Sequence, residues 1–257
     1  MARILTSQAV VGLAAALALA RPVIAGTFSV DPVRVSLSAG HPIDSVTIRN
    51  GAAEPIVVQL EVSSWSQREG EALLAPTTDL LATPPIFRIA AGGTQLVRVG
   101  LRRAPDPQRE LSYRLFLREV PSATPSAPGI RITLSISLPV FVTPLAKLAP
   151  KVNWRAQTAP NGLVRINATN VGNAHVHVAQ LELSQVETGH RLAAQAVSGY
   201  LLGADNRSWT LTPDPLPTPG GLLRVLARTD TGELQADVPL ESSVSVSDVD
   251  PQAMPFR

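Results

Sequence analysis

The stretch that decides the fold class is IRITLSISLPVFV, residues 130–142, in which apolar and polar residues alternate. Every even-numbered position is aliphatic, namely Ile130, Ile132, Leu134, Ile136, Leu138, Val140 and Val142. A period of two predicts a β-strand with one apolar face. The stretch is also roughly twice as long as the usual strand of about 5–6 residues. The apolar face of so long a strand must be covered, either by the core of its own domain or by another protein.

Residues 1–25 have the three parts of a secretory signal peptide: Arg3, an apolar run over 9–20, and small residues at 23–25. A membrane anchor is the competing interpretation, but a span needs about 20 apolar residues and this run is shorter. We therefore expect cleavage after Ala25 and export of a protein that is not embedded in the membrane.

The composition excludes several classes of function. The sequence has no cysteine, so disulfides, thiolate metal sites and cysteine nucleophiles are all excluded. A net charge of +2, with the arginines scattered along the chain, gives no basis for nucleic-acid binding.

Short alternating segments separated by turn residues predict an all-β protein made of antiparallel sandwiches. Two prolines, Pro144 and Pro150, interrupt the pattern and predict a domain boundary. We expect an N-terminal domain over 26–146, a C-terminal domain over 147–241 and a flexible tail over 242–257. The Pro-rich segment 121–129 is expected to be an exposed loop that feeds into the long strand.

Several landmarks occur in a characteristic order and together resemble the periplasmic chaperones of the chaperone-usher pilus pathway. They are Arg34 in VDPVRVSL, Thr83-Pro84-Pro85, the 92–99 segment GGTQLVRV, Arg109-Glu110, the 113–121 segment YRLFLREVP, the long alternating strand, and the turn at Asn170-Val171-Gly172-Asn173. The ending SLPVFVTP is most similar to the alternative, or archaic, branch of that family.

The resemblance implies two immunoglobulin-like domains joined at an angle, which work in the periplasm without ATP. It implies that the protein caps incomplete pilus or fimbrial subunits and delivers them to an outer-membrane usher. The client-binding residues would be Ile130, Ile132, Leu134 and Ile136, inserted into the open groove of a subunit by strand addition. The alternative is that all seven aliphatic side chains face the core of their own domain, which we expect for residues 138–142.

Arg34 is implied to anchor the C-terminal carboxylate of the client, although alternation with Val33 and Val35 is equally typical of an ordinary amphipathic strand. Pro139 stands where well-known members have a second cation. Thr143 stands where they have an arginine that pairs with a glutamate matching Glu110, so the usual ion pair is not expected in this chain. Glu110 and Thr83-Pro84-Pro85 are expected to be structural, the latter with room for a cis bond.

No constellation of catalytic residues is present, so we expect a protein that is not an enzyme and that has no metal or cofactor. His175 and His177 share a strand face, but a metal site needs at least a third ligand, and we expect a surface or interface role. The alternative function is a secreted structural or adhesive pilus component with two immunoglobulin-like domains. The sequence does not name the client or the type of fibre, and it leaves self-association of the free protein open.

Overall fold

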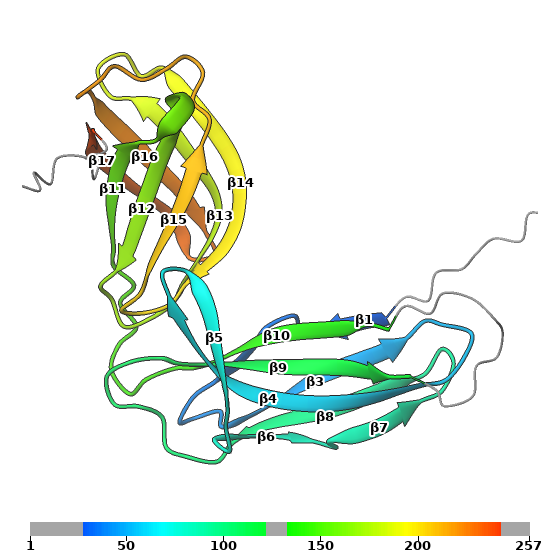
Figure 1. The fold of residues 1–257 in the computed structure, drawn as a ribbon. Helices are drawn as coiled ribbons and strands as arrows, with labels where there is room; N and C mark the ends of the chain where they lie inside the picture. The colour runs from blue at the N-terminus through cyan, green and yellow to red at the C-terminus, as the bar shows by residue number, and fades with distance from the viewer. Residues whose placement is uncertain (1–27, 122–132, 243–257) are drawn as a thin grey trace, which may run out of the picture.

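The computed structural model describes residues 28–121 and 133–242 (Figure 1). The predicted signal peptide, most of the Pro-rich segment 121–129, Ile130, Ile132 and nearly all of the predicted tail lie outside these residues. The described part contains no helix with the length and hydrophobicity that a bilayer span needs.

Strands form both domains, which confirms the predicted fold class of two immunoglobulin-like sandwiches joined at an angle (Figure 1). The strands of the first domain are β1 (Phe28–Asp31), β2 (Val35–Leu37), β3 (Ile43–Asn50), β4 (Ile56–Arg68), β5 (Glu71–Pro76), β6 (Leu80–Thr83), β7 (Ile86–Ile89), β8 (Thr94–Leu101), β9 (Leu111–Val120) and β10 (Ser135–Val142). Those of the second are β11 (Val152–Thr158), β12 (Val164–Asn170), β13 (Val176–Gln185), β14 (Arg191–Leu201), β15 (Asn206–Leu211), β16 (Leu222–Thr229) and β17 (Gly232–Glu241).

The first sandwich has a four-stranded sheet in the order β1-β3-β8-β6 and a six-stranded sheet in the order β2-β10-β9-β4-β5, with β7 also paired to β4. The N-terminal segment contributes to both, because β1 pairs with β3 and β2 pairs with β10. Alternate side chains of the facing strands fill the space between the sheets and form one apolar core. This arrangement follows from the period-two pattern, which turns every second side chain inward.

The second sandwich follows a single path, β14-β13-β16-β17-β11-β12-β15, that folds around its own core. β17 pairs with β16 from Gly232 to Pro239 and with β11 at Leu240 and Glu241. The two cores are separate, so each domain buries its own apolar side chains.

The same type of turn occurs in both domains. In each, a buried asparagine at the end of a strand forms the hydrogen bonds of the turn. The Asn50 amide donates to the carbonyl of Glu54 at 2.8 Å, and the Asn170 amide donates to that of Ala174 at 2.7 Å. Each side-chain oxygen also accepts the N–H of the residue two places on, at 2.9 Å for Asn50 and 3.0 Å for Asn170. Such local bonds explain why asparagine ends both strands.

Candidate functional site

The long strand predicted from residues 130–142 divides into two halves with different neighbours. β10 pairs with β9 along its whole length, from Ser135 to Val142. Its other edge pairs in parallel with β2, but only at Val140–Val142. Within residues 28–121 and 133–242, no strand pairs with this other edge at positions 135–139. We call residues 134–137 the open half and residues 138–142 the closed half of the strand.

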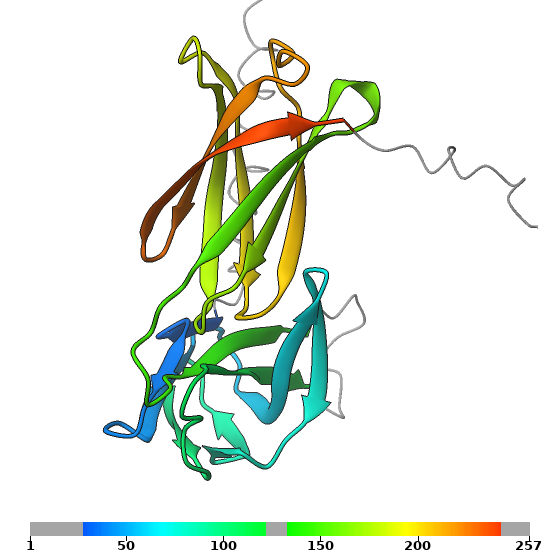
Figure 2. The same cartoon turned by 90° about the vertical axis from the view of Figure 1, so that its left-hand side faces the viewer.

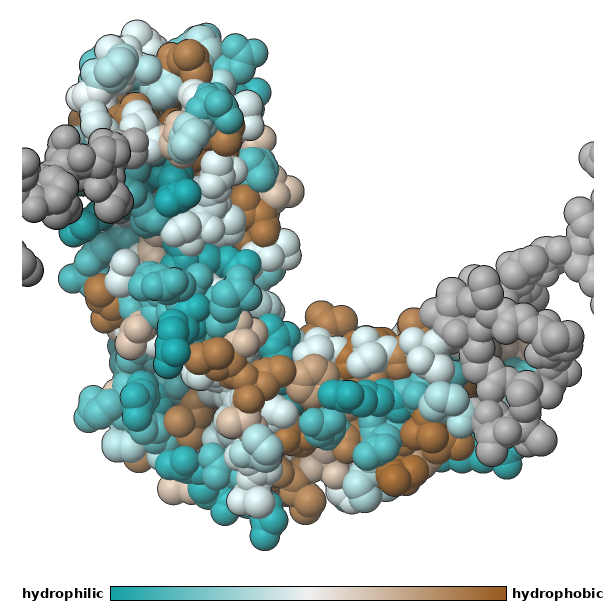
Figure 3. Space-filling model, viewed as in Figure 1, coloured by the Kyte–Doolittle hydropathy of each residue, from teal (hydrophilic) through white to brown (hydrophobic). Residues whose placement is uncertain are grey.

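The closed half belongs to the core of its own domain, as predicted. Leu138, Val140 and Val142 are almost completely buried. In the open half, the Leu134 side chain is 41% exposed and Ile136 is half-buried at the margin of the core. Figure 3 shows apolar side chains along the upper edge of the first domain, where Figure 1 places β10.

Hydrogen bonds with β9 continue to Leu134, the residue before β10 begins. The Leu134 carbonyl accepts from the Glu119 N–H at 2.9 Å, and the Leu134 N–H donates to the Glu119 side chain at 3.1 Å. The exposed leucine is therefore held in line with the strand, with its side chain available.

Arg34 lies in the bend before β2 and crosses to the second domain. Its Nη1 contacts Oδ2 of Asp230 at 2.5 Å, and Asp230 lies in the turn between β16 and β17. The same carboxylate accepts the His177 N–H at 3.1 Å. Arg34 thus reaches the interdomain cleft, as the resemblance implied, but it already has a carboxylate partner there. Its side chain remains 42% exposed, so part of the guanidinium is still accessible.

Glu110 also has a partner from the second domain. Its Oε1 accepts the backbone N–H of His175 at 3.0 Å and lies 2.6 Å from His175 Nδ1. The Nε2 of the same ring lies 3.7 Å from Asp230. In this chain Glu110 therefore pairs with His175. The resemblance had implied an arginine at position 143 as its partner, and this chain has Thr143 there. His175 thus lies at the interface of the domains, and the His177 ring packs against Tyr200 of its own domain. No group of three described His, Asp or Glu side chains is arranged to hold a metal.

A small apolar cluster fills the angle between the domains. Trp65 and Phe141 from the first domain pack against Leu202 and Tyr200 from the second. The Phe141 ring stacks on the His175 imidazole with 3.5 Å between centroids. Phe141 lies between Val140 and Val142 in the sequence, and its side chain points to the opposite face of the sheet. The closed half of β10 is therefore buried on both faces.

Arg114 on β9 is a further charged residue at this cluster that the sequence analysis did not single out. Its guanidinium carbon lies 3.7 Å from the centre of a Trp65 ring and 5.7 Å from that of Tyr200. A guanidinium in this position gains a cation–π contact with each ring.

Two amide side chains form hydrogen bonds between the domains. The Gln67 amide donates to the Tyr200 carbonyl at 3.1 Å and accepts the Leu202 N–H at 2.8 Å. Asn173 donates to the carbonyls of Gln108 and Lys147 at 2.9 and 3.1 Å. Figure 2 shows the hairpin of β4 and β5, which carries Gln67, extending to the lower end of the second domain.

Thr83-Pro84-Pro85 joins β6 to β7, and its Thr83–Pro84 bond is cis. The Pro85 carbonyl accepts the Leu60 N–H at 2.8 Å, which ties the connection to β4.

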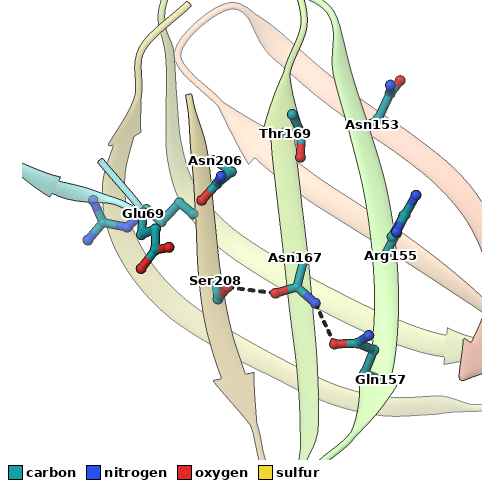
Figure 4. A pocket seen from close by; sticks show the side chains of 9 residues that line it. Glu69, Asn153, Arg155, Gln157, Asn167, Thr169, Asn206 and Ser208 are labelled. Carbon is teal, nitrogen blue, oxygen red and sulfur yellow. Dashed lines mark hydrogen bonds between the residues drawn. The ribbon is translucent and has the colours of Figure 1, made fainter. Parts of the chain in front are cut away.

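A polar depression on the outer face of β11, β12 and β15 is the other concave region of interest (Figure 4). Three of its side chains form a hydrogen-bonded ladder: Ser208 donates to Asn167 at 2.6 Å, and Asn167 donates to Gln157 at 3.1 Å.

Comparison with known proteins agrees with this geometry. Residues 27–147 match the family described as pili and flagellar-assembly chaperone, PapD N-terminal domain. The chain is 32% identical over 104 residues to the chaperone protein PapD of Escherichia coli, and the match covers 38% of this chain and 42% of that protein. This chain is thus aligned with less than half of the length of that relative.

Solved structures share the complete two-domain fold. A chain in the CsuC–CsuE chaperone-tip adhesion subunit pre-assembly complex, from archaic chaperone-usher Csu pili of Acinetobacter baumannii, has a TM-score of 0.59 at 19% identity, covering 85% of this chain and 100% of that one. A chain in the complex of the Salmonella enterica SafA pilin with the SafB chaperone has a TM-score of 0.54 at 17% identity, covering 84% and 96%. These structures show the same fold, and the match of residues 27–147 agrees with the resemblance seen in the sequence.

Proposed function

We propose that this chain is a periplasmic chaperone of the chaperone-usher pathway, a proposal supported by the match of residues 27–147 to the pilus-assembly chaperone N-terminal domain. It binds incomplete pilus or fimbrial subunits by donating a strand, and it then delivers them to an outer-membrane usher. It does so as a binding protein and not as an enzyme. We assign it to the archaic branch on the ending SLPVFVTP, residues 137–144.

The observation that carries the proposal is the open half of β10. An edge strand with unpaired backbone groups and exposed apolar side chains readily pairs with another chain, and proteins normally protect such edges with charge or proline. Here Leu134 is exposed beside an edge that no described strand covers at positions 135–139. The edge is suited to strand addition by a client.

Residues 130, 132, 134 and 136 would occupy successive pockets of the groove in the subunit. Residues two apart on a strand are separated by about 6.6–6.8 Å, so strict alternation matches one side chain to each pocket. Burying four aliphatic side chains stabilises the complex by roughly 6–12 kcal/mol before the costs of association are subtracted. The contribution of Ile136 is expected to be the smallest, because this residue is already half-buried at home.

Arg34 would anchor the C-terminal carboxylate of the client. Guanidinium forms two parallel hydrogen bonds with a carboxylate. Arg34 precedes Val35, the partner of Val140, so it lies where the unpaired edge of β10 ends, and its side chain is partly exposed. Asp230 would hold the guanidinium in position for the client, since it contacts only one side of it.

The alternative function, a structural or adhesive pilus component, is less well supported. Such a subunit is expected to carry a detachable N-terminal extension, whereas β1 and β2 are integrated into the two sheets of the first domain. The relatives named above are chaperones as well.

Co-expression with the subunit from a neighbouring gene tests the proposal directly. We expect the subunit to stay soluble with the native chain and to precipitate with the double variant Ile132→Asp, Leu134→Asp. The matched control is Thr133→Asp, Ser135→Asp, which adds the same charges to the opposite face of the same segment. Equal solubility with all three proteins would refute donation of this strand.

Arg34→Ala separates anchoring from folding. We expect weaker capture of the subunit with an unchanged circular dichroism spectrum, because the Arg34 ion pair is partly exposed and such pairs contribute only about 0–1 kcal/mol. An unfolded variant would show that the residue is structural.

A further inference from the structure

Glu119 breaks the alternating pattern of β9. Tyr113, Leu115 and Leu117 turn inward and are buried in the core of the first domain. Position 119 continues this row, because side chains two apart share one face of a strand, and its partner on β4 is the fully buried Val58. The pattern therefore predicts an aliphatic residue here, and a carboxylate at the margin of a core needs a hydrogen-bond partner.

The backbone of Leu134 is that partner. The Glu119 N–H donates to the Leu134 carbonyl at 2.9 Å, and the Glu119 carboxylate accepts the Leu134 N–H at 3.1 Å. In an ordinary antiparallel pair the backbone carbonyl of Glu119 would accept this N–H. Here the ionised side chain accepts it, and hydrogen bonds to a charged acceptor are the stronger kind. Glu119 thus holds both peptide groups of Leu134.

These two contacts determine what the other edge of the strand presents. The N–H and C=O of a planar trans peptide point in opposite directions. Because the Leu134 N–H points toward β9, the Thr133 carbonyl in the same peptide group points away from β9. Because the Leu134 carbonyl also points toward β9, the Ser135 N–H points away. The open half therefore offers one acceptor and one donor on its free edge, as pairing with an added strand requires.

Little else holds Leu134 in place. β10 begins at Ser135, so Leu134 lies just outside the regular pairing, and residues at the ends of elements open most easily. The Leu134 side chain is 41% exposed, so its own packing contributes little. The contacts with Glu119 therefore keep this residue in line with the strand.

We propose that Glu119 is a positioning residue for strand donation. Its N–H and its carboxylate fix both peptide groups of Leu134, so that the Thr133 carbonyl and the Ser135 N–H face the strand of the client. This inference rests on the proposed function. An edge that is ordered in advance binds at a lower entropic cost than one that must be ordered in the complex. Without the carboxylate, Leu134 would have to be brought into line at each binding event.

Three variants separate positioning from folding. Glu119→Leu supplies the aliphatic residue that the pattern predicts, so it should be as stable as the native chain while it loses the acceptor for the Leu134 N–H. Glu119→Gln keeps an acceptor oxygen and should restore the contact. Glu61→Leu is the matched control, because Glu61 is an exposed carboxylate on the neighbouring strand β4 that pairs with Arg118 at 3.1 Å.

Amide hydrogen exchange of the free chain, followed by NMR, reports on the Leu134 N–H directly. We expect its exchange rate to rise about tenfold in Glu119→Leu, the change that loss of one hydrogen bond allows. The rate should change by no more than about twofold in Glu119→Gln and Glu61→Leu.

Competition measures the effect on the client. The native chain and one variant, carrying different tags, are co-expressed with the subunit from a neighbouring gene, and the ratio of the two chaperones bound to the subunit is determined. We expect about ten native chains bound for each Glu119→Leu chain, and a ratio within about twofold of unity for Glu119→Gln and Glu61→Leu. Urea denaturation should show no loss of stability in Glu119→Leu.

An unchanged exchange rate of Leu134 in Glu119→Leu, or a raised rate with equal binding of the subunit, would overturn the inference and leave the proposed function intact. A Glu119→Gln variant that loses as much as Glu119→Leu would also overturn it, because a retained acceptor would then have no value. A loss of stability in Glu119→Leu that parallels the loss of binding would make Glu119 a structural residue instead. If the native chain binds no subunit at all, the proposed function fails, and this inference fails with it.

Discussion

The two halves of one strand differ in their neighbours more than in their composition. Residues 138–142 are buried on both faces and have partners on both edges from Val140 onwards, whereas residues 134–137 have a single partner and keep Leu134 exposed. Both halves carry aliphatic residues at every even position. The end of the open edge is set by where β2 begins, opposite Val140, and the pattern within β10 does not reveal it.

The closed half also fixes the angle at which the open half is presented. Phe141 projects from it into the cluster between the domains and stacks on His175. The open half is thus attached to a rigid support, which is useful for a strand that has to enter a groove in register with successive pockets.

The largest expected effect is that of a charge in the closed half. Val140→Asp places a carboxylate in the core of the first domain, where Val140 is fully buried, and we expect a loss of about 4–5 kcal/mol in the free energy of unfolding. Urea denaturation measured by circular dichroism gives this value. Ser137→Asp is the control, since Ser137 is exposed; similar losses in both variants would contradict the division of the strand.

The next effect concerns the contact of the closed half with the second domain. Phe141→Ala removes a buried ring from the interdomain cluster, and we expect a loss of about 3 kcal/mol. Fluorescence of Trp65, which packs against Phe141 with 6.0 Å between centroids, reports the change. Phe116→Ala serves as the control, because Phe116 lies on the same face of the sheet outside this cluster. Equal effects of the two variants would show that the cluster does not stabilise the interface.

A smaller effect is expected for the polar contact beside that cluster. Glu110→Gln keeps an acceptor for the His175 N–H but removes the charge, and we expect a loss of about 1–2 kcal/mol. Urea denaturation at neutral pH measures it against Glu61→Gln, which breaks only the exposed pair with Arg118 and should cost about 0.5 kcal/mol or less. If Glu110→Gln costs no more than the control, then the contact with His175 contributes nothing to the union of the domains.

The fold and the location of the open strand were predictable because both depend on local periodicity, as residues 130–142 illustrate. The location of Arg34 came from the family resemblance, but its partner did not, since Asp230 is 196 positions away in the sequence. The same holds for Arg114: only the register of β9 with β10 places it next to Pro139. Long-range pairs of this kind are determined by the register of strands and by how the domains dock, and no pattern along the chain predicts them.

Ile136 marks the limit of what alternation can decide. A period of two shows that the side chain turns to one face of a strand, but the same pattern describes a face that meets its own core and one that meets a client. The structure places Ile136 at the margin, packed against the core yet only partly buried. Its assignment as a client-binding residue remains a prediction.

The smallest effect on stability is expected where the effect on function is greatest. Leu134→Asp alters a side chain that is 41% exposed, and surface substitutions usually change the free energy of unfolding by no more than about 0.5 kcal/mol. Because an aspartate in an apolar pocket of the client is costly, the same substitution should greatly reduce capture of the subunit. Urea denaturation and co-purification, measured on one preparation, test both expectations. A large loss of stability would mean that Leu134 belongs to the core of its own domain, and its side chain would then not be available to a client.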